Sequence, residues 1–253
     1  VGGFMMTKNI LITGAATGLG RATVLKLAEQ GHNIAVVDFN VEEGEKTVAL
    51  AKEAGANALF IQADVSNEEN VQNYVAKTIE AFGTINVFFN NAGLMIPFRL
   101  LHEYEENEYD RIMNVNVKGA FFGVKYVIPH MLENGGGTIV NTVSSNSFKP
   151  TAYNGVYSMS KHALNGLTKS IGQDYHDKNI FAVGVAPNNM LTSISKNAAV
   201  TYTEEIGKAI HATTPPNIAA TAEEVAEAMI FAMNNGKMLT GSTINCAGGQ
   251  ILL

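Results

Sequence analysis

Tyr157 and Lys161 are the residues whose types and spacing point most directly to chemistry. In a helix, positions four apart lie on one face, so the lysine ammonium would approach the tyrosine ring. A nearby positive charge favours the tyrosinate and moves the phenol pKa from its ordinary value of about 10 toward neutral pH. Tyr157 could then exchange a proton with an alcohol or ketone oxygen, and Ser144, thirteen residues upstream, could hydrogen-bond that oxygen. Such a pair is also common on helix surfaces, so the interpretation depends on other motifs.

A glycine-rich segment, Thr13-Gly14-Ala15-Ala16-Thr17-Gly18-Leu19-Gly20, is the second motif. It follows an apolar run that reads as the first strand and precedes a run of helical character. Glycine at positions 14, 18 and 20 allows a tight turn and a close approach of the backbone to a phosphate. A pyrophosphate there would meet the free N–H groups at the start of a helix. The segment therefore predicts a dinucleotide site.

Together these motifs resemble those of the short-chain dehydrogenase/reductase family, in its branch of about this length. The shared patterns are T-G-x3-G-x-G at residues 13–20, N-N-A-G at residues 90–93 and Y-x3-K at residues 157–161. The resemblance runs from about Lys8 to the C-terminus. It implies a catalytic set of Ser144, Tyr157 and Lys161 with Asn116, which would hold a water near the lysine. It also implies that Ser144 and Tyr157 contact the substrate.

The expected cofactor is NAD(H). Asp38 ends the second strand, 18 residues beyond Gly20, where a carboxylate can accept hydrogen bonds from both ribose hydroxyls and repel a 2′-phosphate. Phe39 and Thr17 offer no base to such a phosphate. The resemblance adds further residues that would line the cofactor cleft: Leu19, Asp64, Val65, Asn91, Ala92, Gly93, Pro187 and Thr192, together with Tyr157 and Lys161.

Three positions depart from the family pattern. Asn188 stands where Pro187 is usually followed by glycine, and its side chain could reach the substrate or shift the nicotinamide. Ser147 replaces a common glycine after the catalytic serine and is expected to alter the substrate pocket. Ala247 replaces a common aspartate and is expected to affect C-terminal packing.

The elements that must position these residues alternate along the chain. Nearly continuous apolar runs predict strands covered on both faces; these are residues 9–13, 34–38, 59–63, 85–90, 138–143 and 181–186. Amphipathic stretches predict helices at residues 20–30, 42–54, 68–82, 109–132, 154–175 and 222–233. The sequences 66–69 and 221–224 each have the spacing of a capping box. This alternation predicts an α/β fold, a single-domain Rossmann-like doubly wound parallel sheet with helices on both faces.

One domain is expected over residues 5–253, because no repeat, linker or break in composition divides the chain. Residues 188–217 are rich in Ser, Thr, Ala and Asn and predict a substrate lid. Residues 1–4 precede Met5 and Met6, so we expect them to lie outside the native chain.

Composition narrows the class of protein. With 253 residues, 46% of them hydrophobic, the chain can bury a full core. A net charge of −6 without a Lys/Arg run gives no indication of nucleic-acid binding. No apolar run is long enough to span a membrane, and the single cysteine, Cys246, excludes an internal disulfide and favours the cytoplasm. The six histidines show no metal-ligand spacing, so no metal site is expected.

The sequence therefore predicts an NAD(H)-dependent oxidoreductase that interconverts a small-molecule secondary alcohol and a ketone, with Tyr157 as general acid and base. Aliphatic or cyclic alcohols, sugars and steroids all remain open as substrates. The alternative is a catalytically silent protein of the same fold that binds NAD(H) as a sensor or scaffold. The family resemblance further implies a homotetramer, or a homodimer, with the helices at residues 109–132 and 154–175 in the interface.

Overall fold

The computed structural model describes residues 6–188, 190, 203–211 and 220–248. Seven parallel strands form one sheet with the order β3-β2-β1-β4-β5-β6-β7. The strands are β1 Asn9–Thr13, β2 Asn33–Asp38, β3 Asn57–Gln62, β4 Val87–Asn90, β5 Gly137–Thr142, β6 Ile180–Pro187 and β7 Thr243–Cys246. All six expected strands are present, and the short seventh strand was missed.

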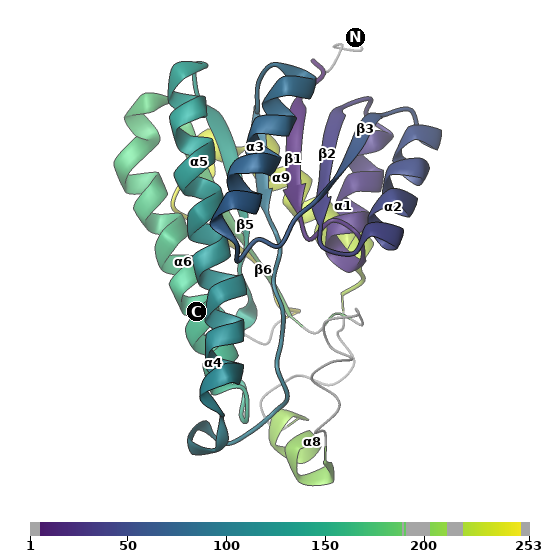
Figure 1. Ribbon diagram of the computed structural model, residues 1–253. Coiled ribbons are helices and arrows are strands. Elements are labelled where there is room, and N and C mark those ends of the chain that lie inside the picture. The colour runs from purple at the N-terminus through teal and green to yellow at the C-terminus, as the bar shows by residue number, and fades with distance from the viewer. Residues whose placement is uncertain (1–5, 189, 191–202, 212–219, 249–253) are drawn as a thin grey trace.

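Helices cover both faces of the sheet (Figure 1). They are α1 Gly18–Ala28, α2 Val41–Glu53, α3 Glu68–Phe82, α4 Glu106–Met113, α5 Ala120–Glu133, α6 Gly155–Tyr175, α8 Glu204–His211, α9 Ala222–Asn234 and α10 Gly236–Leu239. One core cluster joins α1, α2 and α9 to the sheet, and another joins α3, α5 and α6 to its opposite face. The structure is therefore the doubly wound, single-domain α/β fold that the sequence predicts.

The strands are apolar on both sides because both faces are covered. Ile10, Leu11 and Ile12 of β1 are each fully buried; Ile10 and Ile12 pack into one cluster, whereas Leu11 packs into the other. Alternate residues of a strand point to opposite faces, so an uninterrupted apolar run is needed in a sheet of this kind.

The helix expected over residues 109–132 differs from the observed one. The observed helix begins at Glu106 and runs through α4, a π-helical turn at Asn114–Gly119 and α5. A π turn requires local backbone contacts that an apolar pattern does not reveal.

The two expected capping boxes have different outcomes. Thr221 caps α9 as expected, with the Thr221 side chain accepting from Glu224 N and the Glu224 side chain accepting from Thr221 N. At α3 the cap is Asn67, which accepts a hydrogen bond from Asn70 N, so the prediction of Ser66 was wrong by one residue. The Ser66 hydroxyl instead donates a hydrogen bond of 2.7 Å to the carboxylate of Asp64, two residues earlier. A charged carboxylate forms stronger hydrogen bonds than a neutral acceptor.

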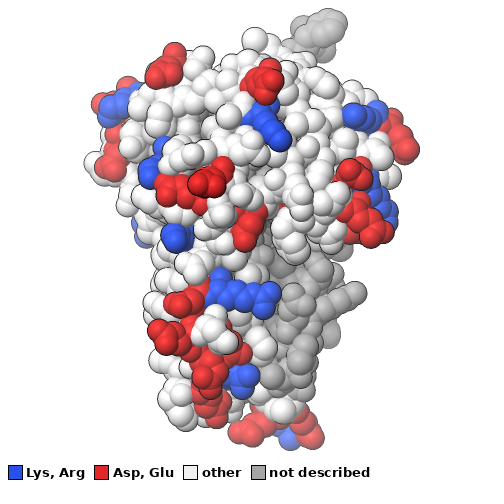
Figure 2. Space-filling model, in the orientation of Figure 1, with Lys and Arg blue, Asp and Glu red and all other residues white. Residues whose placement is uncertain are grey.

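No helix among the described residues is long and apolar enough to cross a membrane. On the face shown in Figure 2, acidic and basic side chains are interspersed over the described surface, with carboxylates gathered toward the lower end. That end includes α4, whose first turn carries Glu106 and Glu108.

Candidate active site

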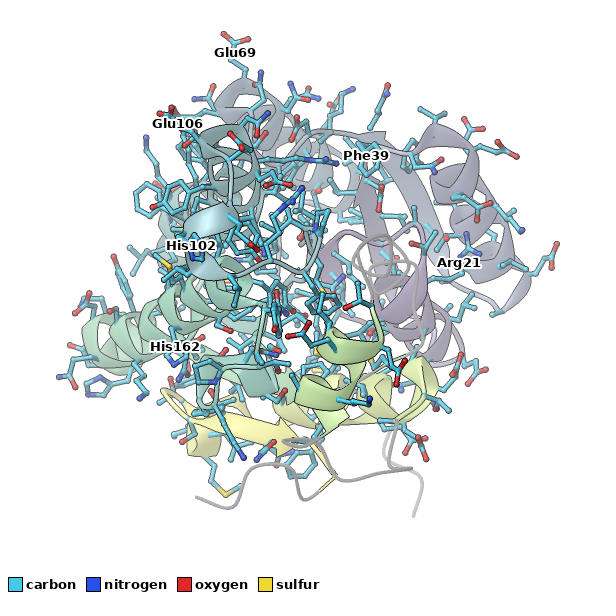
Figure 3. The ribbon with its side chains drawn as sticks, turned by 90° about the horizontal axis from the view of Figure 1, so that it is seen from below. Arg21, Phe39, Glu69, His102, Glu106 and His162 are labelled. Atoms are coloured by element: carbon cyan, nitrogen blue, oxygen red, sulfur yellow. The ribbon has the colours of Figure 1, made fainter. Side chains whose placement is uncertain are left out.

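The carboxyl ends of the strands meet at one edge of the sheet, which Figure 3 views from below. The chain order reverses between β1 and β4, which are neighbours in the sheet although β2 and β3 separate them in sequence. In open parallel sheets such a reversal separates the connecting loops and leaves a crevice where ligands bind. The glycine-rich segment follows β1, and Ser144, Tyr157 and Lys161 follow β5.

Backbone conformation and close contacts require glycine in the glycine-rich segment. Gly14 has φ +64°, and a Cβ there would lie 2.8 Å from Ala92 Cα; a Cβ on Gly20 would lie 2.1 Å from the carbonyl oxygen of Gly14. Gly18 also has a positive φ, +54°, and α1 begins at this residue. Only glycine fits this close turn, and the N–H groups of the first turn of α1 emerge at the sheet edge. The turn therefore fits a pyrophosphate.

The other residues of this segment contribute differently. Leu19 is buried in the core, so only its backbone can face a ligand, whereas Thr17 is partly buried at the start of α1. Arg21 is a positively charged residue of α1, and the Thr47 hydroxyl that it binds also donates to Ala16 O in the glycine-rich segment. Its guanidinium is bound by Glu43 and by Thr47 on α2.

Asp38 lies at the end of β2 beside the glycine-rich segment. Its Oδ2 accepts a hydrogen bond from Ala16 N and its Oδ1 accepts one from Asn40 N, both 3.0 Å. A carboxylate has about four lone-pair positions, so both oxygens can accept further bonds from ribose hydroxyls. Phe39 follows with 74% of its surface exposed, and Figure 3 shows it on the same side of the molecule as Arg21.

Asp64 and Val65 form the loop after β3. The Asp64 carboxylate accepts from both the N–H and the hydroxyl of Ser66, and Val65 packs against Gly119 of the π turn, where a Cβ would lie 2.9 Å from Val65 Cγ2. The loop therefore packs against the helix that carries Asn116.

Asn91 forms hydrogen bonds at the ends of three strands. Its Nδ2 donates to the carbonyl oxygens of Thr13 and Gly14 at 3.0 and 3.1 Å, and its Oδ1 accepts from the Thr142 hydroxyl at 2.9 Å. Its N–H and that of Ala92 both donate to Thr13 Oγ1. This side chain joins the ends of β1, β4 and β5. Gly93 follows, and a Cβ there would approach Lys161 Nζ to 3.5 Å.

The structure brings Ser144, Tyr157 and Lys161 together. Ser144 and Lys161 are 6% and 4% exposed, and Tyr157 is partly buried. Lys161 Nζ lies 5.7 Å from the centroid of the Tyr157 ring and donates a hydrogen bond of 2.8 Å to the carbonyl oxygen of Thr142. The cluster can therefore present a hydroxyl, a phenol and an amine to one ligand.

The electrostatics of this cluster differ from the sequence expectation. Burial raises the pKa of Tyr157 to about 12, and a hydrogen bond with Ser144 offsets only part of that rise. Burial also lowers the pKa of Lys161 to about 8. The expectation considered the attraction between the ammonium and the tyrosinate but not desolvation, which disfavours both charged forms.

Asn116 lies in the π turn and is fully buried. Its Oδ1 accepts from Leu94 N at 2.8 Å, and its Nδ2 donates to Leu94 O at 3.0 Å and to Ser160 Oγ at 3.1 Å. The Asn116 amide therefore joins the loop after β4 to α6, where its partner Ser160 directly precedes Lys161.

The three unusual positions make specific contacts. Asn188 accepts from Ser145 Oγ at 3.3 Å and donates to the carbonyl oxygen of Ala247 at 3.4 Å. Its φ is not positive, so the backbone at this position does not require glycine. Ser147 is 2% exposed and its hydroxyl is bonded to protein groups, so the side chain does not face a ligand directly, and its expected effect on the substrate pocket stays a prediction. Ala247 is buried, as its expected packing role requires.

The remaining expected elements are described only in part. Thr192 and most of the expected lid lie outside the described residues; within the lid range the described segment 203–211 contains α8. Pro187 ends β6 and is buried.

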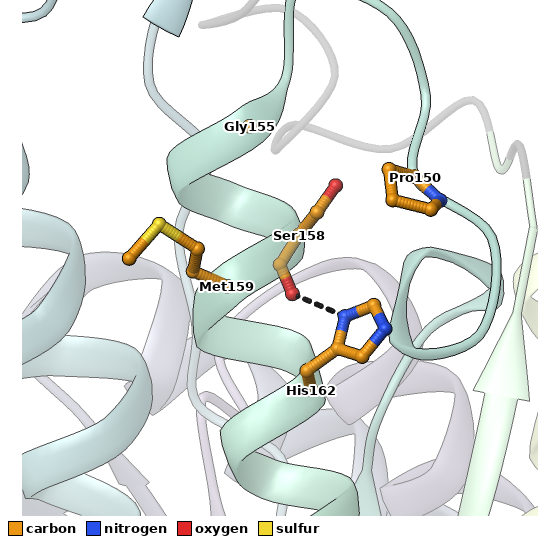
Figure 4. A pocket seen from close by; sticks show the side chains of 5 residues that line it. All are labelled: Pro150, Gly155, Ser158, Met159 and His162. Carbon is orange, nitrogen blue, oxygen red and sulfur yellow. Dashed lines mark hydrogen bonds between the residues drawn. The ribbon is translucent and has the colours of Figure 1, made fainter.

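A hollow of about 410 Å³ lies between α6 and the loop that carries Pro150 (Figure 4). It is lined by Pro150, Gly155, Ser158, Met159 and His162. The His162 ring is hydrogen-bonded to the carbonyl oxygen of Ser158 at 2.8 Å. The hollow does not include the proposed catalytic side chains, so it is distinct from the candidate site. No group of three His, Cys, Asp or Glu side chains within the described residues could hold a metal ion.

Comparisons with known proteins show which family and which solved structures this chain resembles. A family model described as short chain dehydrogenase matches residues 8–203. An uncharacterized oxidoreductase of Thermotoga maritima is 37% identical over 246 residues, which cover 96% of this chain and 97% of that protein. The crystal structure of levodione reductase superposes with a TM-score of 0.90 at 31% identity and covers 97% of this chain and 98% of its own. The crystal structure of NAD+-bound xylitol dehydrogenase superposes with a TM-score of 0.87 at 30% identity. The match covers 96% of this chain and 98% of that chain.

Proposed function

The chain belongs to the short chain dehydrogenase family and is an oxidoreductase of that family, and from this premise we propose that it interconverts a secondary alcohol and a ketone with NAD(H). The observation that carries the proposal is the cluster of Ser144, Tyr157 and Lys161 at the carboxyl edge of the sheet. A hydroxyl donor, a phenol and an amine in this arrangement are what proton exchange with a carbinol oxygen needs.

The cofactor assignment is supported by the glycine-rich turn and by Asp38. Gly14, Gly18 and Gly20 would hold the pyrophosphate, and Asp38 would accept from the adenosine ribose while disfavouring a 2′-phosphate. Leu19, Asp64, Val65, Asn91, Ala92, Gly93 and Pro187 would line the cleft, with Thr17 and Phe39 at its adenosine end. When bound, the nicotinamide would accept or supply the hydride. Xylitol dehydrogenase, solved with NAD+ bound, supports the choice by similarity.

In this proposal each side chain has a defined task. Ser144 donates a hydrogen bond to the substrate oxygen, and Tyr157 takes the hydroxyl proton during oxidation or returns it during reduction. Lys161 supplies positive charge beside the phenol in its protonated form. Asn116 holds the loop after β4 in place and, through that, the space around Lys161. Asn188 is placed to limit the substrate side of the site.

The proposed substrate is a small neutral alcohol or ketone, and the cytoplasm is the proposed location. Levodione reductase and xylitol dehydrogenase are named for a cyclic diketone and a polyol, so both substrate classes belong in a first panel.

Tyr157→Phe tests the proposal. We expect NADH formation from NAD+ and a responding secondary alcohol to fall by at least about 100-fold, because the variant removes the proton-transferring hydroxyl. NADH binding, followed by fluorescence, should change little. Turnover is followed by NADH absorbance with NAD+ and NADP+ in parallel.

Tyr74→Phe is the matched control. Tyr74 is also a buried tyrosine, but it lies on α3 and its hydroxyl has no hydrogen-bond partner among the described residues. This variant should keep full activity. A fully active Tyr157→Phe would refute the role of Tyr157. A wild-type protein that binds NADH but oxidises no alcohol in the panel would favour the sensor or scaffold alternative.

A further inference from the structure

The hydroxyl of Ser147 lies between two of the proposed catalytic residues. Its Oγ accepts a hydrogen bond from the backbone N–H of Ser144 at 3.1 Å and donates one of 2.8 Å to the backbone carbonyl of Lys161. Ser147 is 2% exposed, so water does not compete freely for either bond. One side chain therefore connects the loop of Ser144 to the helix of Lys161.

The backbone around Ser144 is held from several directions. Ser147 N donates to Ser144 O at 2.8 Å, which closes the short turn at Ser145–Ser147. The Ser144 hydroxyl oxygen accepts from Asn146 N at 3.1 Å. With that bond made, the hydroxyl hydrogen of Ser144 is available to Tyr157 or to a substrate oxygen, and a hydrogen bond between Ser144 and Tyr157 lowers the pKa of the phenol.

We propose that Ser147 is a positioning residue, which fixes the distance between the Ser144 loop and the Tyr157–Lys161 face of α6. The inference rests on the proposed function. Tyr157 and Lys161 are held in register by their shared helix, whereas Ser144 lies in the loop after β5 and must be aligned with them by contacts between loop and helix. Small misalignments of reacting groups lower rates strongly, so such a contact has catalytic value.

A second contact holds the loop without involving a catalytic residue. The side chain of Asn146 accepts from Thr151 N and from Ser158 Oγ, each at 2.9 Å. Loss of the Ser147 hydroxyl should therefore leave the loop folded while it releases the alignment of Ser144. The Asn146 contacts therefore keep the loop folded, whereas the Ser147 contacts set its position relative to Lys161.

The test compares Ser147→Ala and Ser147→Gly with the wild type. Both variants remove the hydroxyl, and we expect each to lower kcat for alcohol oxidation by about 10-fold, the factor for about 1.4 kcal/mol, with NADH affinity unchanged. The acidic limb of the pH profile should move to higher pH, because a displaced Ser144 no longer lowers the pKa of Tyr157. Amide hydrogen exchange at Ser144 should also accelerate.

Thr78→Val is the control for a general structural effect. Thr78 is fully buried on α3, and its hydroxyl donates to Tyr74 O at 2.7 Å, so the variant also deletes one buried hydroxyl bond. It should lower the melting temperature without moving the pH profile. Equal rates at every pH for wild type and Ser147→Ala, or a loss in both Ser147 variants that is uniform across pH, would overturn the inference. A wild type without any turnover would instead count against the proposed function.

Discussion

At the scale of single residues, the site combines groups whose charged forms the fold disfavours. Burial raises the pKa of Tyr157 and lowers that of Lys161, so each neutral form gains relative to its charged form. For Lys161, which is charged at neutral pH in the unfolded chain, burial therefore costs folding free energy, as is common at functional sites. The Tyr157 phenol is neutral near pH 7 in both states and adds no such cost.

The pH dependence of stability should reveal this cost for Lys161. Its folded-state pKa of about 8 lies below the ordinary 10.5, so the unfolded chain binds more protons between these two values. Stability should therefore rise with pH across that window, by up to roughly 3 kcal/mol.

Lys161→Met removes the titrating group while it keeps an apolar chain of similar length. We expect the variant to be more stable than the wild type near pH 7, with the difference shrinking as pH approaches 10. Urea unfolding at several pH values measures it. A difference that does not depend on pH would contradict the burial of a titrating amine.

Asp38 should determine the choice of cofactor. Asp38→Asn keeps an oxygen that can accept from Ala16 N or Asn40 N but removes the negative charge that would repel a 2′-phosphate. We expect the preference for NAD+ over NADP+ to fall roughly 10-fold, for a repulsion of about 1–2 kcal/mol between nearby charges in a partly exposed site. The ratio of kcat/KM for the two cofactors measures it.

Arg21 limits how far that preference can move. Its guanidinium is already bound by Glu43 and Thr47, so removing the Asp38 charge does not by itself supply a partner for a phosphate. Full conversion to NADP+ by Asp38→Asn alone would contradict this placement of Arg21. An unchanged preference would contradict the role of Asp38.

At the scale of elements, glycines are required at some positions and tolerated at others. Gly20→Ala would place a Cβ 2.1 Å from the carbonyl oxygen of Gly14, which is backbone and cannot move aside, and should destabilise the fold by about 3 kcal/mol or more. Gly166 lies in the interior of α6 with open space around its Cβ direction. Gly166→Ala should stabilise the fold by about 0.5–1 kcal/mol.

Thermal unfolding of both variants checks the pair. Gly20→Ala should also lose NADH binding, since the turn of the glycine-rich segment would be displaced. Equal melting temperatures for the two variants would show that the turn at Gly20 is less constrained than its contacts imply.

The elements also show which predictions succeed from sequence alone. The glycine-rich turn is predictable because Gly14 and Gly18 have positive φ and Gly20 packs on Gly14, which are constraints local in sequence. The strands are predictable because both faces of the sheet are covered. The cap at Asn67 and the π turn are local choices that an apolar pattern does not distinguish. The bond from Ser147 to the carbonyl oxygen of Lys161 joins a loop to a helix, and such contacts depend on the folded chain. No periodicity in the chain records such contacts. The pKa of Tyr157 depends on burial, which is likewise a property of the folded chain.

At the scale of the whole molecule, large apolar side chains remain exposed on the outer helices. Phe121 on α5 is 50% exposed and Met159 on α6 is 46% exposed. Exposed apolar side chains mark contacts between proteins where they form a contiguous patch. We propose that these helices form the contact between copies of this chain in a homotetramer or homodimer.

Sedimentation velocity at micromolar protein tests this assembly. The wild type should sediment as an oligomer, and Phe121→Glu should shift the distribution toward the monomer. Lys46→Glu, an exposed change on α2 that covers the other face of the sheet, should leave it unchanged. A monomeric wild type would refute the proposed contact.

The π turn at Asn114–Gly119 can also be understood as a phase shift. It accommodates one residue more than a regular turn, and each residue of an α-helix turns the chain by about 100°. Ile112 before the turn packs with Ile96 and Val156, whereas Ala120 after it packs into a separate cluster with Val143 and Leu164. Deleting one residue there would restore a regular α-helix but would rotate either α4 or α5 by about 100° away from the side chains it packs against. A single extra residue thus lets one continuous helix serve two cores that a uniform repeat could not serve together.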